Sequence, residues 1–286
     1  MEGKLYLCPT PIGNLEDITL RVIHTLEACQ AVYCEDTRRT GQLLRHLGVA
    51  KPLVSCHAHN EAQRGQEIVE RVLAGEAIAY ASDAGMPGIS DPGERLIQRC
   101  QAAGAPYEVL PGPSASLTAL VASGLPVQEA VFVGFLPRSG KERREWIARL
   151  GRQTGSLILY ESPLRLSDTA KELAQAWGDR PAVLCRELTK LHQQVLPASL
   201  EALGRLYEAQ PPKGECVLVV GGRPPEGPAT ESLEDTLLRL LQGGLRAKDA
   251  ARQASDLLDV PRNVAYARAL ELKEQLKNPS GSDTLE

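Results

Sequence analysis

The chain has 286 residues, of which 43% are hydrophobic and 24% charged, with a formal net charge of −4. At roughly 150 residues per domain this length suggests two domains, and the composition excludes an intrinsically disordered chain. Charged residues interrupt every apolar stretch before the roughly 18 residues that a membrane span needs. The first residues lack a signal peptide's apolar core, so we expect a cytoplasmic protein without a membrane segment. The acidic balance weakens the case for nucleic-acid binding, although a local basic patch can serve that purpose.

The seven cysteines are scattered and never form a Cys-x-x-Cys pair. A disulfide framework and a zinc ribbon are therefore not expected. Most of the cysteines lie in apolar runs such as residues 182–185. We expect them to be reduced and buried, as small hydrophobic side chains.

Short apolar runs, typical of buried strands, alternate with segments of helical period in the first part of the chain. The expected strands are Lys4–Cys8, Ala31–Cys34, Leu53–Cys56, Ala77–Ala81 and Tyr107–Leu110. The expected helices are Leu20–Cys29, Thr37–Leu47, Asn60–Ala74 and Glu94–Ala103. This alternation predicts right-handed crossovers and a mostly parallel sheet.

After residue 126 the pattern changes and predicts a second α/β unit of mixed strand direction. Its expected strands are Val131–Phe135, Ser156–Tyr160, Pro181–Arg186, His192–Leu196 and Cys216–Val220. Its expected helices are Lys141–Arg152, Arg165–Trp177 and Leu200–Ala209.

Residues 221–228 are rich in Pro and Gly and predict a linker. Three helical patterns follow, at Leu233–Leu241, Ala247–Leu258 and Arg262–Leu276. They indicate either a helix-turn-helix or a small helical cap. We therefore divide the chain into α/β domains at 1–122 and 123–223, a linker at 224–231, a helical domain at 232–277 and a tail at 278–286.

Three Pro/Gly-rich loops, at residues 9–14, 82–93 and 111–115, directly follow predicted strands. Ligands of open parallel sheets bind at the carboxyl ends of the strands, and Gly lets the backbone approach a ligand closely. The loops therefore predict a small-molecule site, although Pro and Gly can also serve only to form turns. The dinucleotide motif Gly-x-Gly-x-x-Gly does not follow any predicted strand, and Gly140-Lys141 lacks the rest of a P-loop.

Several sequence blocks occur in the order found in a known family. They are residues 5–19, 34–40, 82–93, 111–115, 159–163, 186–190 and 213–220. Together they resemble the tetrapyrrole methylase superfamily, specifically its ribosomal RNA small-subunit methyltransferase I branch. The helices around residues 248–251 and 261–263 resemble that branch's C-terminal helix-turn-helix.

The resemblance implies two α/β domains with S-adenosylmethionine in the cleft between them, a small helical domain and a homodimer. It implies methylation of the ribose 2′-hydroxyl of a cytidine in the decoding region of 16S rRNA. The substrate is then the RNA itself or the small ribosomal subunit, and the reaction requires no metal. The expected cofactor residues are Pro11, Ile12, Gly13, Asp83, Gly85, Met86, Ser114, Ala115, Tyr160, Glu187, Leu188 and Glu215. Two positions depart from the branch, which usually has Thr at Met86 and Gly near Pro197.

The chemistry of methyl transfer indicates which residue types matter. The reaction is an in-line displacement that depends on alignment, and a carboxylate such as Asp83 or Glu215 suits the donor's cationic end. A ribose hydroxyl needs a base, or a cation beside the developing alkoxide. Candidate catalytic residues are Asp36, His57, His59, Glu161, Glu187 and Lys190. Residues 56–60 could suggest chelation, but their spacing is not a usual zinc pattern and no metal site is expected.

A basic run at the start of a predicted helix suggests phosphate contacts. Its cations are Arg138, Lys141, Arg143 and Arg144, which we expect on one exposed face. Arg38 and Arg39 are further candidates, unless Asp36 beside them serves only to cap a helix. Aromatic residues total only 4%, so a broad base-stacking platform is not expected.

Two other functions remain open at this stage. One is methylation of a tetrapyrrole or another small molecule on the same fold. The other is a non-catalytic RNA-binding or ribosome-assembly factor, against which the three Pro/Gly loops argue.

Overall fold

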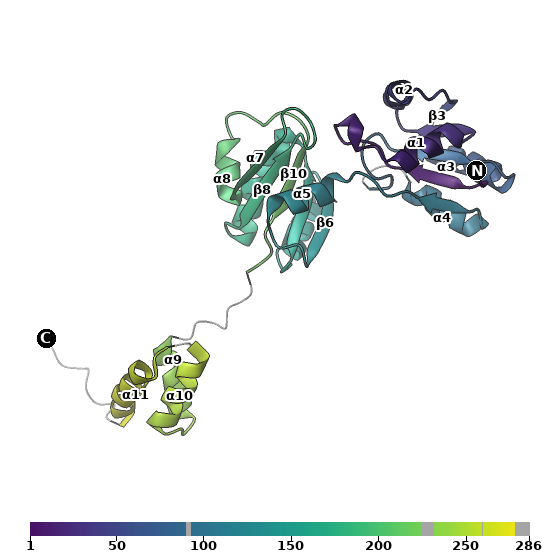
Figure 1. Cartoon of the computed structure of the whole chain (residues 1–286). Helices are drawn as coiled ribbons and strands as arrows, with labels where there is room; N and C mark the ends of the chain where they lie inside the picture. The colour runs from purple at the N-terminus through teal and green to yellow at the C-terminus, as the bar shows by residue number, and fades with distance from the viewer. Residues whose placement is uncertain (90–92, 225–231, 259, 278–286) are drawn as a thin grey trace. The chain divides into compact units, whose positions relative to one another are not determined.

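The computed structural model describes residues 1–89, 93–224, 232–258 and 260–277. The chain divides into two compact units, Met1–Arg223 and Pro224–Glu286. Figure 1 labels most of the helices of both units and some of the strands of the first.

The first sheet is built from the five expected strands, all parallel, in the order β3-β2-β4-β1-β5. These strands are β1 (Leu5–Cys8), β2 (Ala31–Cys34), β3 (Leu53–Ser55), β4 (Ile78–Ala81) and β5 (Tyr107–Val109). The connecting helices are α1 (Leu20–Ala28), α2 (Thr37–His46), α3 (Glu61–Leu73) and α4 (Glu94–Ala103). Helices α3 and α4 cover one face of the sheet, and α1 and α2 cover the other. The predicted parallel sheet is confirmed.

The second sheet has the order β6-β7-β10-β8-β9 and mixed strand direction, as predicted. Its strands are β6 (Ala130–Phe135), β7 (Ser156–Glu161), β8 (Pro181–Arg186), β9 (Gln194–Ser199) and β10 (Cys216–Val220). Helices α6 (Gly140–Leu150), α7 (Leu166–Trp177) and α8 (Leu200–Leu206) pack on one face of this sheet. Helix α5 (Ala115–Ser123), which the sequence pattern did not predict, packs on the other face (Figure 1).

Strand β9 begins two residues later than expected and contains Pro197, which lies opposite Val183 of β8. Because β9 is the edge strand, a residue without an N–H is tolerated there. The departure at Pro197 is therefore accommodated within a strand.

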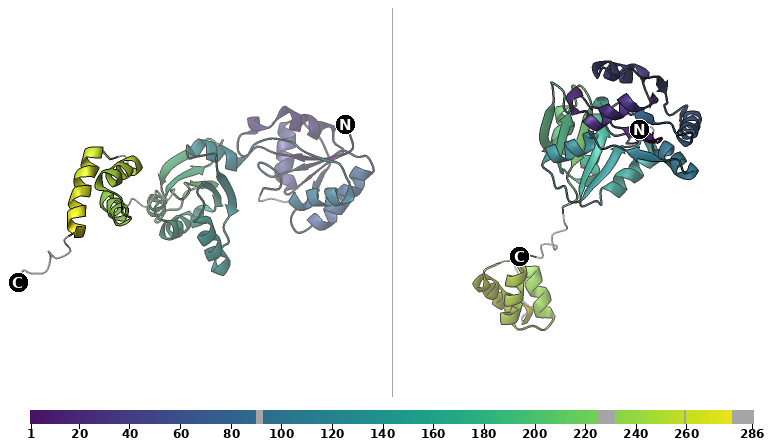
Figure 2. Two further views of the ribbon diagram at one scale, coloured as in Figure 1. Left: turned by 90° about the horizontal axis from the view of Figure 1, so that it is seen from below. Right: turned by 45° about the vertical axis from the view of Figure 1, so that its right-hand side comes forward.

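The second unit contains the three predicted helices, α9 (Leu233–Gln242), α10 (Ala247–Leu258) and α11 (Arg262–Lys277), drawn in green to yellow in Figure 2. Its core is made mainly of small side chains, with Leu237 packed against Ala250, Ala254, Ala265 and Ala269. Alanines let the helix backbones approach closely, so a short chain can form a core of its own.

All seven cysteines are free and buried, as predicted. Burial raises the pKa of Cys56 to about 12 and that of Cys185 to about 11. In the part of the chain that the structure describes, none of the helices is long and apolar enough to cross a membrane.

Candidate functional site

The three Pro/Gly loops meet at the carboxyl edge of the first sheet. The Thr10 N–H donates to the Gly85 carbonyl at 3.1 Å, and the Gly85 N–H donates back to the Thr10 carbonyl at 2.9 Å. The Thr10 hydroxyl donates to the Ser82 carbonyl at 3.0 Å. A Cβ at Gly112 would overlap the Pro9 ring, so the third loop also packs closely against the first. The sheet-edge argument correctly predicted this meeting of loops.

Gly85 is required where these loops approach one another. Its φ is +82°, a backbone region that side chains disfavour. A Cβ there would lie 3.3 Å from Ile12 Cγ2 and 3.5 Å from the Pro113 carbonyl oxygen. A side chain there would therefore press on Ile12 and come into contact with the Pro113 carbonyl.

A cavity of 560 Å³ opens at this edge, a volume in the range of small-molecule sites. It is lined by residues of the first sheet's loops and of the second sheet. The expected cofactor residues that line it are Ile12, Asp83, Gly85, Met86, Ser114, Ala115, Tyr160 and Glu215.

The remaining expected cofactor residues lie beside the cavity. Pro11 lines a neighbouring cavity of 210 Å³ that also includes Asp83. Leu188 is buried against Ile12 in the apolar cluster below, and a Cβ at Gly13 would press on Thr189 and Lys190.

The described lining carries more negative than positive groups. Its carboxylates are Glu35, Asp83, Glu161 and Glu215, and its one guanidinium is Arg39. Cations outside the lining offset part of this charge, because Glu215 pairs with Lys190 and Glu161 with Arg165. Glu35 and Phe135 also line the cavity but were not among the predicted site residues, because their only feature in the sequence is a position at or beside the end of a strand.

Asp83 joins the loop after β4 to the start of α2. Its Oδ1 accepts the Asp36 backbone N–H at 3.1 Å, and its Oδ2 lies 3.7 Å from Arg39 Nη1. The Asp36 carboxylate accepts the backbone N–H of Arg38 at 2.8 Å and its guanidinium at 2.7 Å. These hydrogen bonds hold the pKa of Asp36 well below its usual range. Asp36 is thus the N-cap of α2 and a poor proton acceptor near neutral pH.

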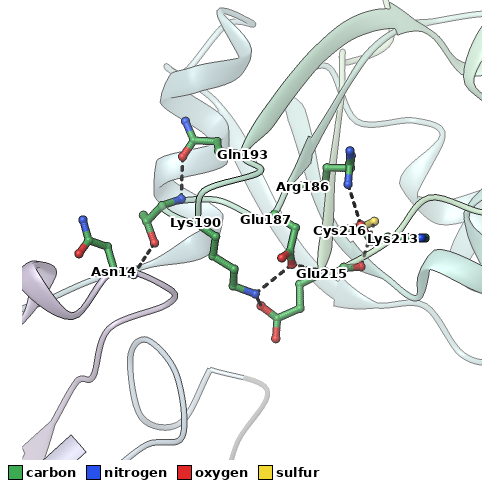
Figure 3. Close-up of polar contacts among 10 residues, drawn as sticks. Asn14, Arg186, Glu187, Lys190, Gln193, Lys213, Glu215 and Cys216 are labelled. Atoms are coloured by element: carbon green, nitrogen blue, oxygen red, sulfur yellow. Dashed lines mark hydrogen bonds and ion pairs between the residues drawn. The ribbon is translucent and has the colours of Figure 1, made fainter. Parts of the chain in front are cut away.

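Glu187, Lys190 and Glu215 form one cluster (Figure 3). The Lys190 ammonium lies 2.9 Å from Glu187 Oε1 and 3.0 Å from Glu215 Oε2. The hydrogen bond from Lys190, with one from the Glu215 amide, lowers the pKa of Glu187. Burial opposes the charge on Lys190, but its bonds to the two carboxylates outweigh burial and raise its pKa. Lys190 is therefore charged at neutral pH and cannot accept a proton.

The turn that carries this cluster has unusual backbone geometry. Glu187 and Thr189 have φ values of +49° and +65°, in the left-handed region that non-glycine residues rarely adopt. The Thr189 hydroxyl accepts the Asn14 N–H at 3.0 Å, which ties the turn to the loop after β1. Strain of this kind persists where surrounding contacts enforce it, and it concentrates at functional sites.

Glu161 is buried at the cavity wall, 3% exposed. Its carboxylate accepts the Ser162 N–H at 2.7 Å and the Thr169 hydroxyl at 2.6 Å. The same Thr169 oxygen receives a guanidinium N–H of Arg143 at 3.0 Å. Arg165 Nε also lies 3.3 Å from Glu161 Oε1, so this carboxylate fixes the loop that begins at Ser162.

Arg143 contradicts the expected exposed face of α6. It is 7% exposed and donates to Glu172 at 2.7 Å and to the Pro137 carbonyl at 2.9 Å. Arg143 therefore points from α6 towards α7 and forms an ion pair with Glu172 of that helix. Arg138, Lys141 and Arg144 are exposed, so the patch consists of these three cations.

His57 and His59 lie beyond β3, at the edge of the sheet, outside the described lining of the cavity. The His57 N–H donates to Asn60 Oδ1 at 2.8 Å, and the two rings are 5.9 Å apart. Among the described residues there is no group of three ligands that could hold a metal. Of the six catalytic candidates, only Glu161 lines the cavity directly.

The family model described as Tetrapyrrole (Corrin/Porphyrin) Methylases matches residues 4–204. The chain belongs to this family. A second model, described as the RsmI C-terminal HTH domain, matches residues 228–273, which span α9, α10 and most of α11. The predicted resemblance to the family and to its C-terminal helix-turn-helix is confirmed.

Two curated relatives match over nearly the whole chain, and both are named Ribosomal RNA small subunit methyltransferase I. The protein from Synechocystis is 40% identical over 95% of this chain and 99% of its own length. The protein from Halalkalibacterium halodurans is 40% identical over 93% and 94%. Among solved structures, uroporphyrin-III C-methyl transferase from Thermus thermophilus, complexed with S-adenyl homocysteine, has a TM-score of 0.56. It is 20% identical and covers 76% of this chain and 97% of its own, which shows the shared fold.

Proposed function

We propose that this chain transfers a methyl group from S-adenosylmethionine to ribosomal RNA of the small subunit. The observation that carries the proposal is the 40% identity to proteins named Ribosomal RNA small subunit methyltransferase I, which extends over 95% of the chain. That span includes the helical unit as well as both sheets. A homodimer and recognition of the small ribosomal subunit are parts of the same proposal.

The cavity fits the proposed donor. A donor with a sulfonium and an ammonium group matches a lining with several carboxylates, of which Asp83 and Glu215 were expected to face the donor. Gly85 lets backbone groups approach without an intervening side chain. Bound there, S-adenosylmethionine would supply an electrophilic methyl group, and the protein's task would be alignment. The fold relative complexed with S-adenyl homocysteine, the donor's demethylated form, is consistent with this assignment.

We further propose the ribose 2′-oxygen of a cytidine in the decoding region as the acceptor. Asp36 and Lys190 are held in ion pairs, with the pKa of Asp36 lowered and that of Lys190 raised, so neither serves as the base. Lys190 instead acts as a positioning residue, because it holds the Glu215 carboxylate at the cavity wall.

The test is methyl transfer in vitro. Purified protein and donor with a labelled methyl group are incubated with small subunits that lack the modification. We expect label in 16S rRNA, and nuclease digestion should place it on a 2′-oxygen. Label on a base would overturn the 2′-oxygen assignment.

The family description favours a second candidate, methylation of a tetrapyrrole. A parallel reaction with uroporphyrinogen decides between the two functions. Transfer to the tetrapyrrole with none to RNA would reject the proposed function.

A further inference from the structure

Strand β6 carries an irregularity that reorients its aromatic residues. Phe132 pairs with Ile158 of β7 and Gly134 with Leu159, so Val133 is left without a partner. Gly134 has a φ of +68°, a left-handed conformation that glycine adopts readily. Residues three apart in a regular strand point to opposite faces of the sheet. Because the bulge inserts one residue, Phe132 and Phe135 point to the same face.

Both phenyl rings pack on Tyr160 of the neighbouring strand. The Phe132 and Tyr160 ring centroids are 5.3 Å apart with an interplanar angle of 74°. The Phe135 and Tyr160 centroids are 5.6 Å apart with an angle of 63°. These edge-to-face contacts are favourable for aromatic rings. We call Phe132, Phe135 and Tyr160 the aromatic cluster.

The two phenylalanines of the aromatic cluster are exposed although they are apolar, whereas Tyr160 is half-buried. Phe132 is 40% exposed and Phe135 is 56% exposed. They are the only two phenylalanines of the chain, and phenylalanine is among the residues most often buried. A bulge that turns both of them outward onto one tyrosine indicates a surface made for contact.

The aromatic cluster adjoins two other features. Phe135 and Tyr160 line the cavity, whereas Phe132 lies outside its described lining. Directly after β6, the chain presents the exposed cations Arg138, Lys141 and Arg144. Proteins that bind single-stranded nucleic acid combine aromatic faces, on which bases stack, with cations that pair with the phosphates.

We propose that the aromatic cluster is the stacking surface for the acceptor nucleobase, which holds the attached ribose at the mouth of the cavity. This inference rests on the proposed function and adds the residues that grip the substrate. Of the expected donor residues, Tyr160 belongs to the cluster, whereas the carboxylates Asp83 and Glu215 belong to other elements of the lining, so Tyr160 is the point at which the donor and the acceptor base would meet. Along β6 the cluster runs from Phe132, outside the described lining, to Phe135 at the cavity, and the exposed cations come after Phe135 in the chain.

The test compares leucine variants of the aromatic cluster, which keep an apolar side chain but lose the aromatic ring, with a tryptophan variant, which keeps a ring. Phe135→Leu removes the aromatic face but keeps an apolar side chain, whereas Phe135→Trp keeps a face for stacking. We expect Phe135→Leu to raise the KM for small-subunit RNA by roughly 5- to 150-fold, the range that the loss of one stacked base implies. Phe132→Leu should act in the same direction, and Phe135→Trp should stay near the wild-type KM. Because Phe132 lies outside the described lining of the cavity, Phe132→Leu should leave the affinity for S-adenosylmethionine, measured by calorimetry, unchanged. Phe135→Leu should raise the KM for RNA by a larger factor than it raises the donor's dissociation constant.

Leu206→Ala is the matched control. Leu206 is 58% exposed on α8, which packs on the opposite face of the same sheet. This substitution should alter neither the KM for RNA nor the donor affinity. The melting temperature of each variant verifies folding.

Three results would overturn the inference. An unchanged KM in both leucine variants would show that no base stacks there. A lower donor affinity with an unchanged RNA KM would assign the rings to the donor's adenine. A change in oligomeric mass, measured by light scattering, would assign the cluster to contact between copies of the chain.

The dissociation constant for a short fluorescent single-stranded oligoribonucleotide, measured by anisotropy, separates this inference from the proposed function. If the wild type methylates no RNA, the proposed function fails. The oligoribonucleotide still decides the cluster: weaker binding by Phe135→Leu supports the stacking surface, and equal binding rejects it.

Discussion

At the scale of single residues, the absence of a side chain at Gly85 shapes the cavity. Its amide and carbonyl both pair with Thr10, and the space around its Cα is bounded by Ile12 and the Pro113 carbonyl. The role of Gly85 therefore combines backbone conformation with close approach. A glycine with a positive φ but no close neighbours separates the two effects.

We expect Gly85→Ala to weaken S-adenosylmethionine binding by about tenfold, equivalent to roughly 1.4 kcal/mol. Gly104→Ala is the control, because Gly104 has a φ of +66° and no atom lies within 4 Å of the position that a Cβ would take there. Each substitution should lower the free energy of unfolding by about 1–2 kcal/mol through backbone strain. Only Gly85→Ala should change the donor's dissociation constant, measured by calorimetry. Equal donor affinity in the two variants would exclude close approach at Gly85.

The cluster of Glu187, Lys190 and Glu215 predicts a pH-dependent stability. The pKa of Glu187 is lowered in the folded state, so its contribution is present above its ordinary value of about 4.3 and is lost as the pH falls. The pKa of Lys190 is raised, so its contribution is present below its ordinary value of about 10.4 and is lost at higher pH. Both contributions are therefore present between about pH 5 and pH 10.

Lys190→Gln should lower the melting temperature at pH 7, and the difference from wild type should narrow as the pH falls below about 4, where carboxylates become protonated. Lys213→Gln is the control, because Lys213 is an exposed lysine two residues before Glu215. Its melting temperature should differ little from that of the wild type at any pH. Melting curves recorded from about pH 3 to about pH 8 span the ordinary carboxylate range and give the comparison. A difference that stays constant over this range would mean that Lys190 stabilises the turn by packing alone.

At the scale of elements, α6 shows how one helix divides its cations between two tasks. Arg143 holds α6 to α7 through Glu172 and Thr169. Arg144, one residue later, is exposed, because successive helix residues point about 100° apart. Replacement by glutamine should therefore affect stability at the buried Arg143 and RNA binding at the exposed cations.

The triple variant Arg138→Gln, Lys141→Gln, Arg144→Gln should raise the KM for RNA and flatten its salt dependence by roughly 0.7–0.9 in log–log slope per lost phosphate contact. Its melting temperature should barely change, because exposed charges contribute little to folding. Arg143→Gln should instead lower the free energy of unfolding by about 1–3 kcal/mol. Salt-dependent kinetics and thermal melts measure both. An unchanged salt slope in the triple variant would remove these residues from the RNA site.

The helices and strands also show which parts of the fold can be predicted from the sequence. The strands of the first sheet were predictable because each is a short apolar run between turn residues, and β1, β2 and β4 are fully buried. Helix α5 was missed because Ala115–Ser123 has apolar residues all around rather than on one stripe. The bulge in β6 was missed because a spacing of three predicts opposite faces for Phe132 and Phe135. The expectation against a broad stacking platform rests on composition and stays a prediction, because a cluster of three rings is not a broad platform.

At the scale of the whole molecule, two kinds of inference located the site. The position of Asp83 beside Thr10 followed from physics, since parallel strands place their carboxyl ends at one edge. The contributions of Tyr160 and Glu215 came only from the resemblance, because no periodicity relates the second sheet to the first sheet's loops. The burial of Arg143 followed from neither, since a charge in a sequence does not reveal its partner.

The distribution of cysteines has a consequence for following the protein's unfolding. All seven are buried and belong to Met1–Arg223, and the helical unit has none. Alkylating reagents attack the thiolate, and burial keeps Cys185 and Cys216 protonated by raising the pKa of each to about 11. Thiol modification therefore reports the opening of the two sheets alone and is silent on the three C-terminal helices. The native chain thus carries its own domain-specific reporter of unfolding, without an engineered label.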